Sequence, residues 1–214
     1  MIVTLEKQQK KENRFNLFLD GEFYSGLNLD QIVKYNLKNG LDIEKQKIDE
    51  IVLESEVFYA FNKVLKYISK AMKTEFDLRA YLKQKSFNDE VIEKTIDKLK
   101  LYNYVDDEIY VKSYIQTYKD KFGENKIKQN LKNKKIDEEL IEKYLIFDED
   151  DVLNNIKKEI LKQTKNKAMD IKLKQKIFRN LIFKGYSFEQ IKNAFNLLGE
   201  DDENWDWYGW NWPI

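Results

Sequence analysis

The stretch that decides the fold is Leu82-Lys-Gln-Lys-Ser-Phe-Asn-Asp-Glu-Val-Ile92, because its pattern returns twice further along the chain. It returns as Leu131-Lys-Asn-Lys-Lys-Ile-Asp-Glu-Glu-Leu-Ile141 and, less closely, as Leu181-Ile-Phe-Lys-Gly-Tyr-Ser-Phe-Glu-Gln-Ile191. The leading leucines are 49 and then 50 residues apart. Self-similarity at this period is typical of repeat proteins, in which each unit buries its apolar face on its neighbours. The pattern therefore predicts three copies of one helical unit and argues against most compact enzyme folds.

Each copy reads as a helix, a short loop and a second helix. Leu78 and Leu82 are four residues apart, which puts them on one face of the first helix. After the loop, a residue type that caps helix N-termini occupies the same place in every copy: Asn88, Asp137 and Ser187. An apolar residue precedes each cap, as a hydrophobic staple does: Phe87, Ile136 and Tyr186. Three chance amphipathic helices would not place their caps in register.

The composition favours long helices and excludes several kinds of site. Charged residues make up 36% of the 214 residues, and the single proline is Pro213. The chain has no cysteine and no histidine, which excludes disulfides, thiolate zinc sites and histidine-based catalysis. No apolar run approaches the 18 residues of a membrane span, and no signal peptide opens the chain. We therefore expect a cytoplasmic protein without a metal or cofactor.

The net charge is zero, but the charges are unevenly distributed. Residues 151–199 carry 11 basic and 4 acidic groups, whereas residues 200–214 carry 5 acidic groups and no basic one. The sequence thus predicts a basic module followed by an acidic end. For any single lysine, a solvated helix face remains the simpler interpretation.

The first 55 residues differ from the repeats. Polar and apolar residues alternate in about 2–8, 13–20 and 22–26, and Asp20-Gly21 is a turn signal, so we expect a small antiparallel sheet. Asn28 and Gln31 have the spacing of a capping box for a helix that runs to about Lys38 and is closed by Gly40. A further helix is expected from about Ile43 to Ser55.

We expect a mainly α protein with five segments. These are 1–55, the β-hairpin or sheet with its helices; 56–105, 106–149 and 150–199, three three-helix repeats; and 200–214, an acidic tryptophan-rich tail. The repeats should contain nine helices, near 56–70, 75–85, 88–101, 107–121, 124–134, 138–146, 150–164, 168–184 and 188–198.

The tail holds all four tryptophans of the chain, at positions 205, 207, 210 and 212. Their spacing is that of a tight hairpin with its turn at Tyr208-Gly209. Two interpretations stay open: an exposed aromatic arm for a partner, or tryptophans that fold back on the third repeat.

Residues 56–198 resemble the bacterial RecX family, regulators of the RecA recombinase. The resemblance rests on the repeated caps, on Thr74 to Phe87 and on the junction Tyr102-Asn-Tyr-Val-Asp-Asp-Glu-Ile-Tyr-Val111. The N-terminal hairpin looks like an extension found in Gram-positive members. Family members carry a glycine in the loop of each repeat, where this chain has Ser86, Lys135 and Gly185.

The resemblance implies three tandem three-helix repeats in a curved, elongated array. It also implies a non-enzymatic, monomeric protein that binds RecA filaments on DNA and represses strand exchange, coprotease and ATPase functions. Contacts to phosphates or acidic grooves would fall to basic residues of the repeats, and two of them are arginines, which can make bidentate contacts. The candidates are Arg79, Lys83, Lys85, Lys132, Lys134, Lys172, Lys174, Lys176, Arg179 and Lys184.

Two other classes of function are less consistent with the sequence. Three-helix units can read DNA directly, but the helices after Asn88 and Asp137 begin with acidic residues, which would face phosphates badly. An enzyme is disfavoured because the chain has no phosphate-binding loop and no nucleophile elbow.

Overall fold

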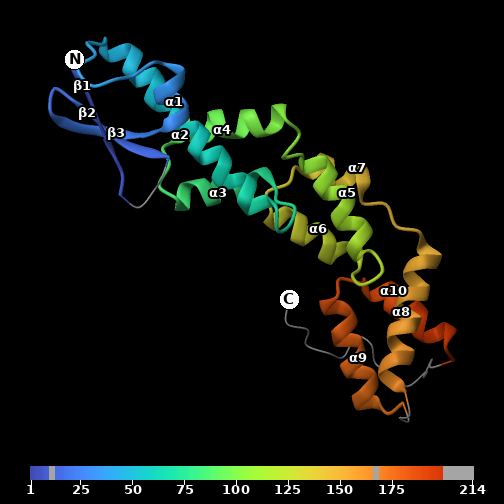
Figure 1. The fold of residues 1–214 in the computed structure, drawn as a ribbon. Helices are drawn as coiled ribbons and strands as arrows, with labels where there is room; N and C mark the ends of the chain where they lie inside the picture. The colour runs from blue at the N-terminus through green and yellow to red at the C-terminus, as the bar shows by residue number, and fades with distance from the viewer. Residues whose placement is uncertain (10–12, 166–168, 200–214) are drawn as a thin grey trace. The chain divides into compact units, whose positions relative to one another are not determined.

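The computed structural model describes residues 1–9, 13–165 and 169–199, and its main content is helical (Figure 1). The elements are β1 (Val3–Lys7), β2 (Arg14–Leu19), β3 (Glu22–Asn28), α1 (Leu29–Lys34), α2 (Lys45–Ile68), α3 (Glu75–Gln84), α4 (Asp89–Leu101), α5 (Asp107–Tyr118), α6 (Glu124–Asn133), α7 (Glu138–Tyr144), α8 (Glu149–Thr164), α9 (Ile171–Phe183) and α10 (Phe188–Leu197). The chain forms two compact units, residues 1–107 and residues 108 onward. The predicted tail hairpin lies outside the described residues.

The predicted sheet is confirmed. Its strands are antiparallel in the order β1-β2-β3. Asp20 and Gly21, with φ of 51° and 88°, form the turn between β2 and β3, as a hairpin turn with two left-handed residues requires. Leu17, Leu19 and Leu27 are buried on one face of the sheet. They pack with α1 and the start of α2 into the N-terminal core.

The prediction for the first helix is wrong in two respects. The Asn28 side chain makes no capping hydrogen bond, and its backbone N–H instead donates to the Ser55 hydroxyl of α2 at 3.0 Å. The helix ends at Lys34 rather than near Lys38. The left-handed residue that follows the helix is Asn36, with φ of 49°, rather than Gly40. Contacts with α2 therefore override the local capping signal.

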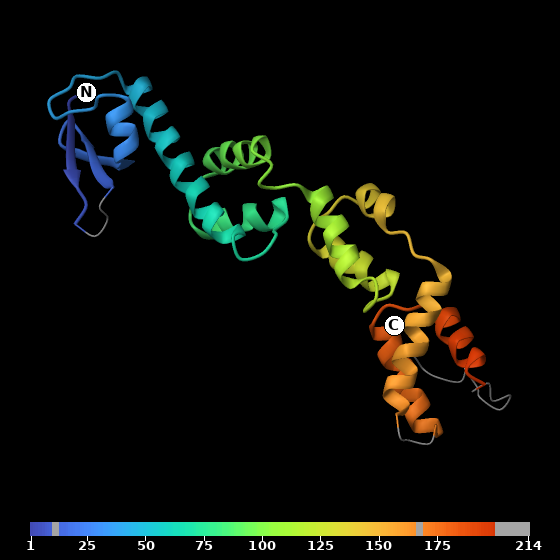
Figure 2. The same cartoon turned by 45° about the vertical axis from the view of Figure 1, so that its right-hand side comes forward.

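The expected helix break between residues 55 and 56 is absent, because α2 is one continuous helix of 24 residues (Figure 2). Its first half buries Ile48 and Ile51 in the N-terminal core, and its second half buries Ala60 and Val64 against α3 and α4. One helix thus serves two small cores. The boundary that we placed at residue 55 has no counterpart in the secondary structure.

The helix caps predicted in the three repeats are confirmed. Side chains of Asn88, Asp137 and Ser187 accept from backbone N–H groups at the starts of α4, α7 and α10. The preceding helices all end in the same way: the N–H groups of Phe87, Ile136 and Tyr186 donate to the carbonyls of Leu82, Leu131 and Leu181. This is the Schellman arrangement, and it needs a left-handed residue in the loop. Ser86, Lys135 and Gly185 occupy that position, with φ of 62°, 58° and 89°. The loss of glycine in two repeats therefore leaves the loop conformation unchanged.

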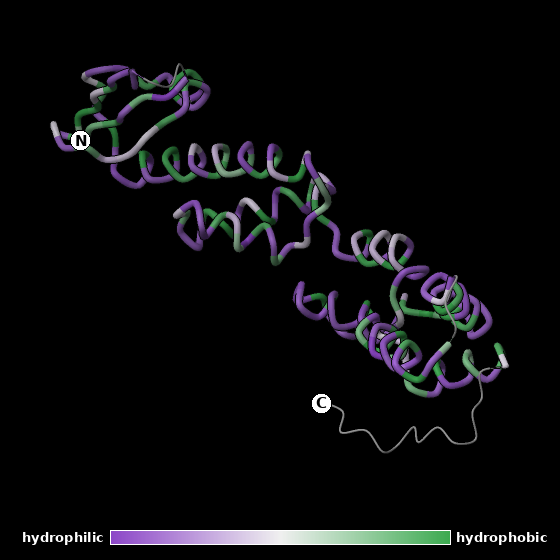
Figure 3. The backbone as a smooth tube through the Cα atoms, turned by 90° about the horizontal axis from the view of Figure 1, so that it is seen from below, coloured by the Kyte–Doolittle hydropathy of each residue, from purple (hydrophilic) through white to green (hydrophobic). Residues whose placement is uncertain are grey.

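Each repeat carries its own apolar core. Between residues 56 and 198, all the regular elements of the described part are helices, and apolar and hydrophilic residues alternate along them (Figure 3). The three cores centre on Leu78 and Leu82, on Ile127 and Leu131, and on Ile177 and Leu181, which are fully buried. The apolar pairs read from the sequence are thus the centres of the cores.

The second and third repeats meet at two glycines within the second unit. The Gly123 N–H donates to the Lys184 carbonyl at 2.9 Å. A Cβ on Gly123 would lie 2.5 Å from the carbonyl carbon of Gly185, and one on Gly185 would lie 2.5 Å from Cβ of Lys126. Such distances are below van der Waals contact, so the junction accepts only glycine at both positions.

Candidate partner-binding surface

The first-repeat candidate Arg79 is engaged by two carboxylates. Its Nε lies 2.7 Å from a carboxylate oxygen of Glu75, and its two terminal nitrogens lie 2.5 and 2.9 Å from the two oxygens of Glu93. The bond to Arg79 lowers the pKa of Glu93, and Glu75 also pairs with Lys100 at 2.6 Å. The guanidinium thus joins α3 to α4. With its nitrogens bound to these two carboxylates, Arg79 is not available for a bidentate phosphate contact, contrary to the prediction.

The second repeat contains an equivalent ion pair. Lys128 stands 49 residues after Arg79 and lies 2.9 Å from Glu142, which stands 49 residues after Glu93. The candidate Lys132 pairs with Glu138 at 2.6 Å, and Lys132 followed by Lys128 lowers the pKa of Glu138. The cations between α6 and α7 are therefore balanced by carboxylates of the same repeat.

The third repeat breaks this pattern. Fifty residues after Lys128 stands Phe178, which is buried and packs edge-on against Phe188 with 5.6 Å between ring centroids. Fifty residues after Glu142 stands Lys192. An apolar contact replaces the ion pair, and a cation replaces the carboxylate. This local exchange is one source of the basic character of the third repeat.

One face of α9 presents the unbalanced charge. Lys172, Lys176, Arg179 and Phe183 are spaced by four, three and four residues, so they share one face of the helix, and all are exposed. We call these four residues the α9 stripe. None of its three cations forms an ion pair with another described residue. Lys126 of α6 adds a fourth cation, 4.7 Å from the centroid of the Phe183 ring.

Two other candidates on the third repeat do not belong to this surface. Lys174 is only 3% exposed, and its ammonium lies 5.7 Å from the centroid of the Phe195 ring, so its assignment to an exposed contact surface is wrong. Lys184 pairs with Glu159 at 3.0 Å and helps to hold α8 to the end of α9. Both side chains have roles within the repeat.

The remaining candidates are scattered. Lys83 and Lys85 are exposed at the end of α3, where the Lys85 ammonium lies 5.5 Å from the centroid of the Tyr81 ring. Lys134 is half-buried after α6. Of the ten predicted residues, the structure groups three on one helix face. Sequence reasoning missed Phe183, Lys126 and Lys192, although alignment of Glu93, Glu142 and Lys192 across the repeats would have shown the charge reversal.

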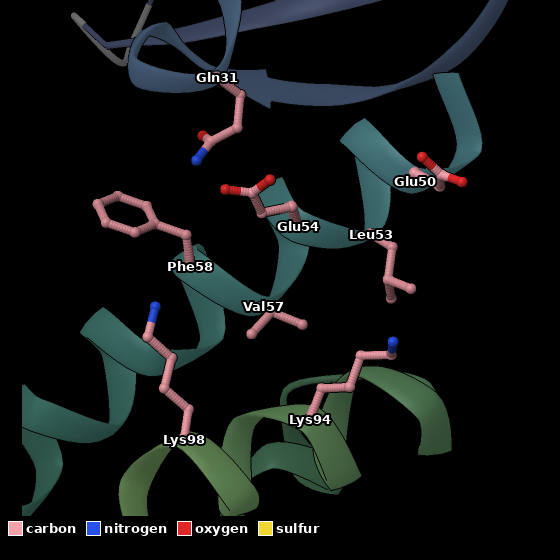
Figure 4. A pocket seen from close by; sticks show the side chains of 8 residues that line it. All are labelled: Gln31, Glu50, Leu53, Glu54, Val57, Phe58, Lys94 and Lys98. Atoms are coloured by element: carbon pink, nitrogen blue, oxygen red, sulfur yellow. The ribbon is translucent and has the colours of Figure 1, made fainter. Parts of the chain in front are cut away.

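A cavity of about 290 Å³ lies in the first unit between α1, α2 and α4 (Figure 4). Glu50 and Glu54 line it from α2, Lys94 and Lys98 line it from α4, and Leu53, Val57 and Phe58 supply apolar contacts. Glu54 is held by Lys34 at 2.6 Å and by the Tyr35 hydroxyl, and these bonds lower its pKa. Carboxylates of α2 thus face ammonium groups of α4 across the cavity.

The described residues contain no cluster of histidine, cysteine, aspartate or glutamate with the geometry of a metal site. In the same part of the chain, no helix combines the length and the apolar character that crossing a membrane requires.

Comparison with known proteins identifies relatives along nearly the whole chain. Models of the regulatory protein RecX N-terminal domain and of the first and second RecX three-helix domains match residues 1–44, 60–99 and 106–145. The chain is 34% identical to the regulatory protein RecX of Clostridium perfringens SM101 over 94% of its own length and 97% of the relative's. It is 32% identical to that of Clostridium acetobutylicum, over 89% and 92%.

Two crystal structures share the fold. That of a regulatory protein RecX is 25% identical with a TM-score of 0.65, over 94% of this chain and 99% of the other. The structure of RecX from Lactobacillus salivarius is 23% identical with a TM-score of 0.59, over 67% and 97%, and shows likeness of fold alone.

Proposed function

Because this chain belongs to the RecX family of regulatory proteins, we propose that it binds the RecA recombinase and its filaments on DNA and inhibits or modulates the recombinase, ATPase and coprotease activities. In this proposal the protein is a non-enzymatic monomer of the cytoplasm. The absence of histidine and cysteine from the chain supports a regulator that acts by binding.

The α9 stripe is the observation that supports the contact to the filament. Its three cations are exposed and have no carboxylate partner among the described residues, whereas Arg79 of the first repeat and Lys128 of the second are held in ion pairs. Arg179 offers a planar fork for a carboxylate or a phosphate, which a lysine cannot match. A chain of repeated helical units can contact a helical polymer at several sites at once. After the first contact forms, the others form at a high effective concentration, so several weak contacts together give strong binding.

The test is the RecA ATPase on single-stranded DNA with the full chain titrated in. We expect repression by the wild type and weaker repression by the variant Lys172→Glu, Lys176→Glu, Arg179→Glu. Lys174 stays unchanged in this variant because reversing a buried cation would disturb the core. The matched control reverses three cations of the second repeat: Lys119, Lys121 and Lys135.

Two outcomes would contradict the proposal in different ways. No effect of the wild type at any ratio to RecA would overturn the proposed function. An equal loss of ATPase repression in the α9 variant and in the control would show that only the total charge matters and that the α9 stripe is not the contact surface.

A second candidate is a module that binds DNA without RecA, and the α9 stripe is the feature that favours it. Three phosphate contacts give a slope of about −2.7 in log affinity against log salt for duplex DNA, and about −2.1 for a single strand. Against it, α4 and α7 begin with acidic residues, as the structure confirms for Asp89, Glu90, Glu138 and Glu139. A salt slope of this size in the absence of RecA would favour direct DNA binding.

A further inference from the structure

The acidic tryptophan-rich end of the chain has no role in the function proposed above. Residues 200–214 contain five acidic residues, no basic residue and all four tryptophans. We propose that this tail docks on the α9 stripe of the same molecule and competes there with the RecA filament on DNA. The competition rests on the proposed function, whereas the docking itself does not.

The chemistry of the α9 stripe matches that of the tail. Lys172, Lys176 and Arg179 have no carboxylate partner among the described residues, and the tail supplies carboxylates. Phe183 is 74% exposed at the other end of the stripe, next to the Lys126 ammonium. Tryptophan is the best aromatic partner for lysine and arginine and also stacks on phenylalanine. A segment that alternates tryptophan with polar residues therefore fits a face that combines cations with an exposed ring.

The tail starts within the same repeat as the stripe. It follows Gly199, two residues after the end of α10. Phe195, four residues before Gly199, has its ring 5.7 Å from the ammonium of Lys174, a buried residue in the first turn of α9, so the last turn of α10 lies beside the first turn of α9.

The length of the tail is sufficient. Fifteen extended residues span about 50 Å, whereas the 13 residues of α9 are about 20 Å long. A short tether of this kind gives an effective concentration on the order of millimolar. Individually weak contacts between exposed charges are then enough to populate the docked state.

Tryptophan fluorescence of the full chain tests the docking, because every tryptophan lies in the tail. At low salt we expect blue-shifted emission and protection from iodide. The variant Lys172→Glu, Lys176→Glu, Arg179→Glu should move the emission toward that of free tryptophan and raise the quenching constant at least twofold. The control Lys45→Glu, Lys66→Glu, Lys70→Glu changes the net charge equally on exposed sites of the first unit and should leave the spectrum unchanged.

A charge-swap variant makes the test specific. Adding Glu200→Lys, Asp201→Lys and Asp202→Lys to the α9 variant restores opposite signs, and protection from iodide should return. The docking proposal fails if the wild-type tryptophans are fully quenched, or if the α9 reversal leaves their protection intact. Protection that disappears on dilution would show docking on a second copy and would also overturn the proposal. None of these measurements contains RecA, so they are independent of the proposed function.

Discussion

The substitution Gly185→Ala tests the junction between the second and third repeats. Two costs add in this variant. A non-glycine residue at a left-handed φ, here 89°, costs about 1–2 kcal/mol. The new Cβ would also lie 2.5 Å from Cβ and 2.9 Å from Cα of Lys126, and relief of such overpacking costs about 1–3 kcal/mol. We therefore expect the second unit to lose about 2–5 kcal/mol.

Gly40→Ala is the matched control, because Gly40 has a similar φ of 81° and no atom within 4 Å of the built Cβ. It should cost only the conformational part, about 1–2 kcal/mol. Lys135→Ala is a second control at the equivalent loop position of the second repeat. It should change stability by less than about 0.5 kcal/mol, because a side chain already occupies that left-handed position.

The loss in free energy of unfolding is measured by urea denaturation, with circular dichroism as the probe. With a slope of about 2 kcal/mol per molar urea, a loss of 3 kcal/mol shifts the midpoint by about 1.5 M. Hydrogen exchange of the Gly123 amide, which donates to the Lys184 carbonyl, should accelerate in Gly185→Ala and not in Gly40→Ala. A loss in Gly185→Ala no larger than in Gly40→Ala would refute the close-packed junction.

Three further predictions concern stability. Leu82→Ala removes a fully buried side chain from the first-repeat core and should cost about 2–4 kcal/mol in chemical denaturation; a loss under about 0.5 kcal/mol would place Leu82 outside the core. Ser86→Gly should stabilise the protein by up to about 1 kcal/mol, seen as a higher melting temperature, because glycine removes the strain of a left-handed φ. Hydrogen bonds from Lys112 and Tyr144 lower the pKa of Glu108 to about 2, so its contribution to stability is present above the unfolded value near 4.5 and is lost as the pH falls toward 2. Glu108→Gln should therefore flatten the fall in urea midpoint between pH 5 and pH 2, and an unchanged profile would contradict the assignment.

Features that depend on a few neighbouring residues could be predicted from the sequence. The caps at Asn88, Asp137 and Ser187 and the hairpin turn at Asp20-Gly21 are of this kind. Their hydrogen bonds close within about four residues, so the local chain contains both partners. Repetition of the caps at a constant period then gave the number of helical repeats and the RecX resemblance.

Other features were decided by tertiary contacts. The N–H of Asn28 bonds to Ser55 instead of taking part in a capping box, and α2 continues through the boundary that we expected because it serves two cores. Neither partner is visible from a local window of sequence.

The candidate surface shows the same division. The sequence by itself determined that the third repeat is the basic one, because net charge depends on composition alone. Only the tertiary structure decided which cations remain available: Arg79 is bound by Glu93 from another helix, Lys174 is buried beside Phe195, and Arg179 stays exposed. Ion pairing and burial depend on which helices pack together, and residues far apart in the chain set that packing.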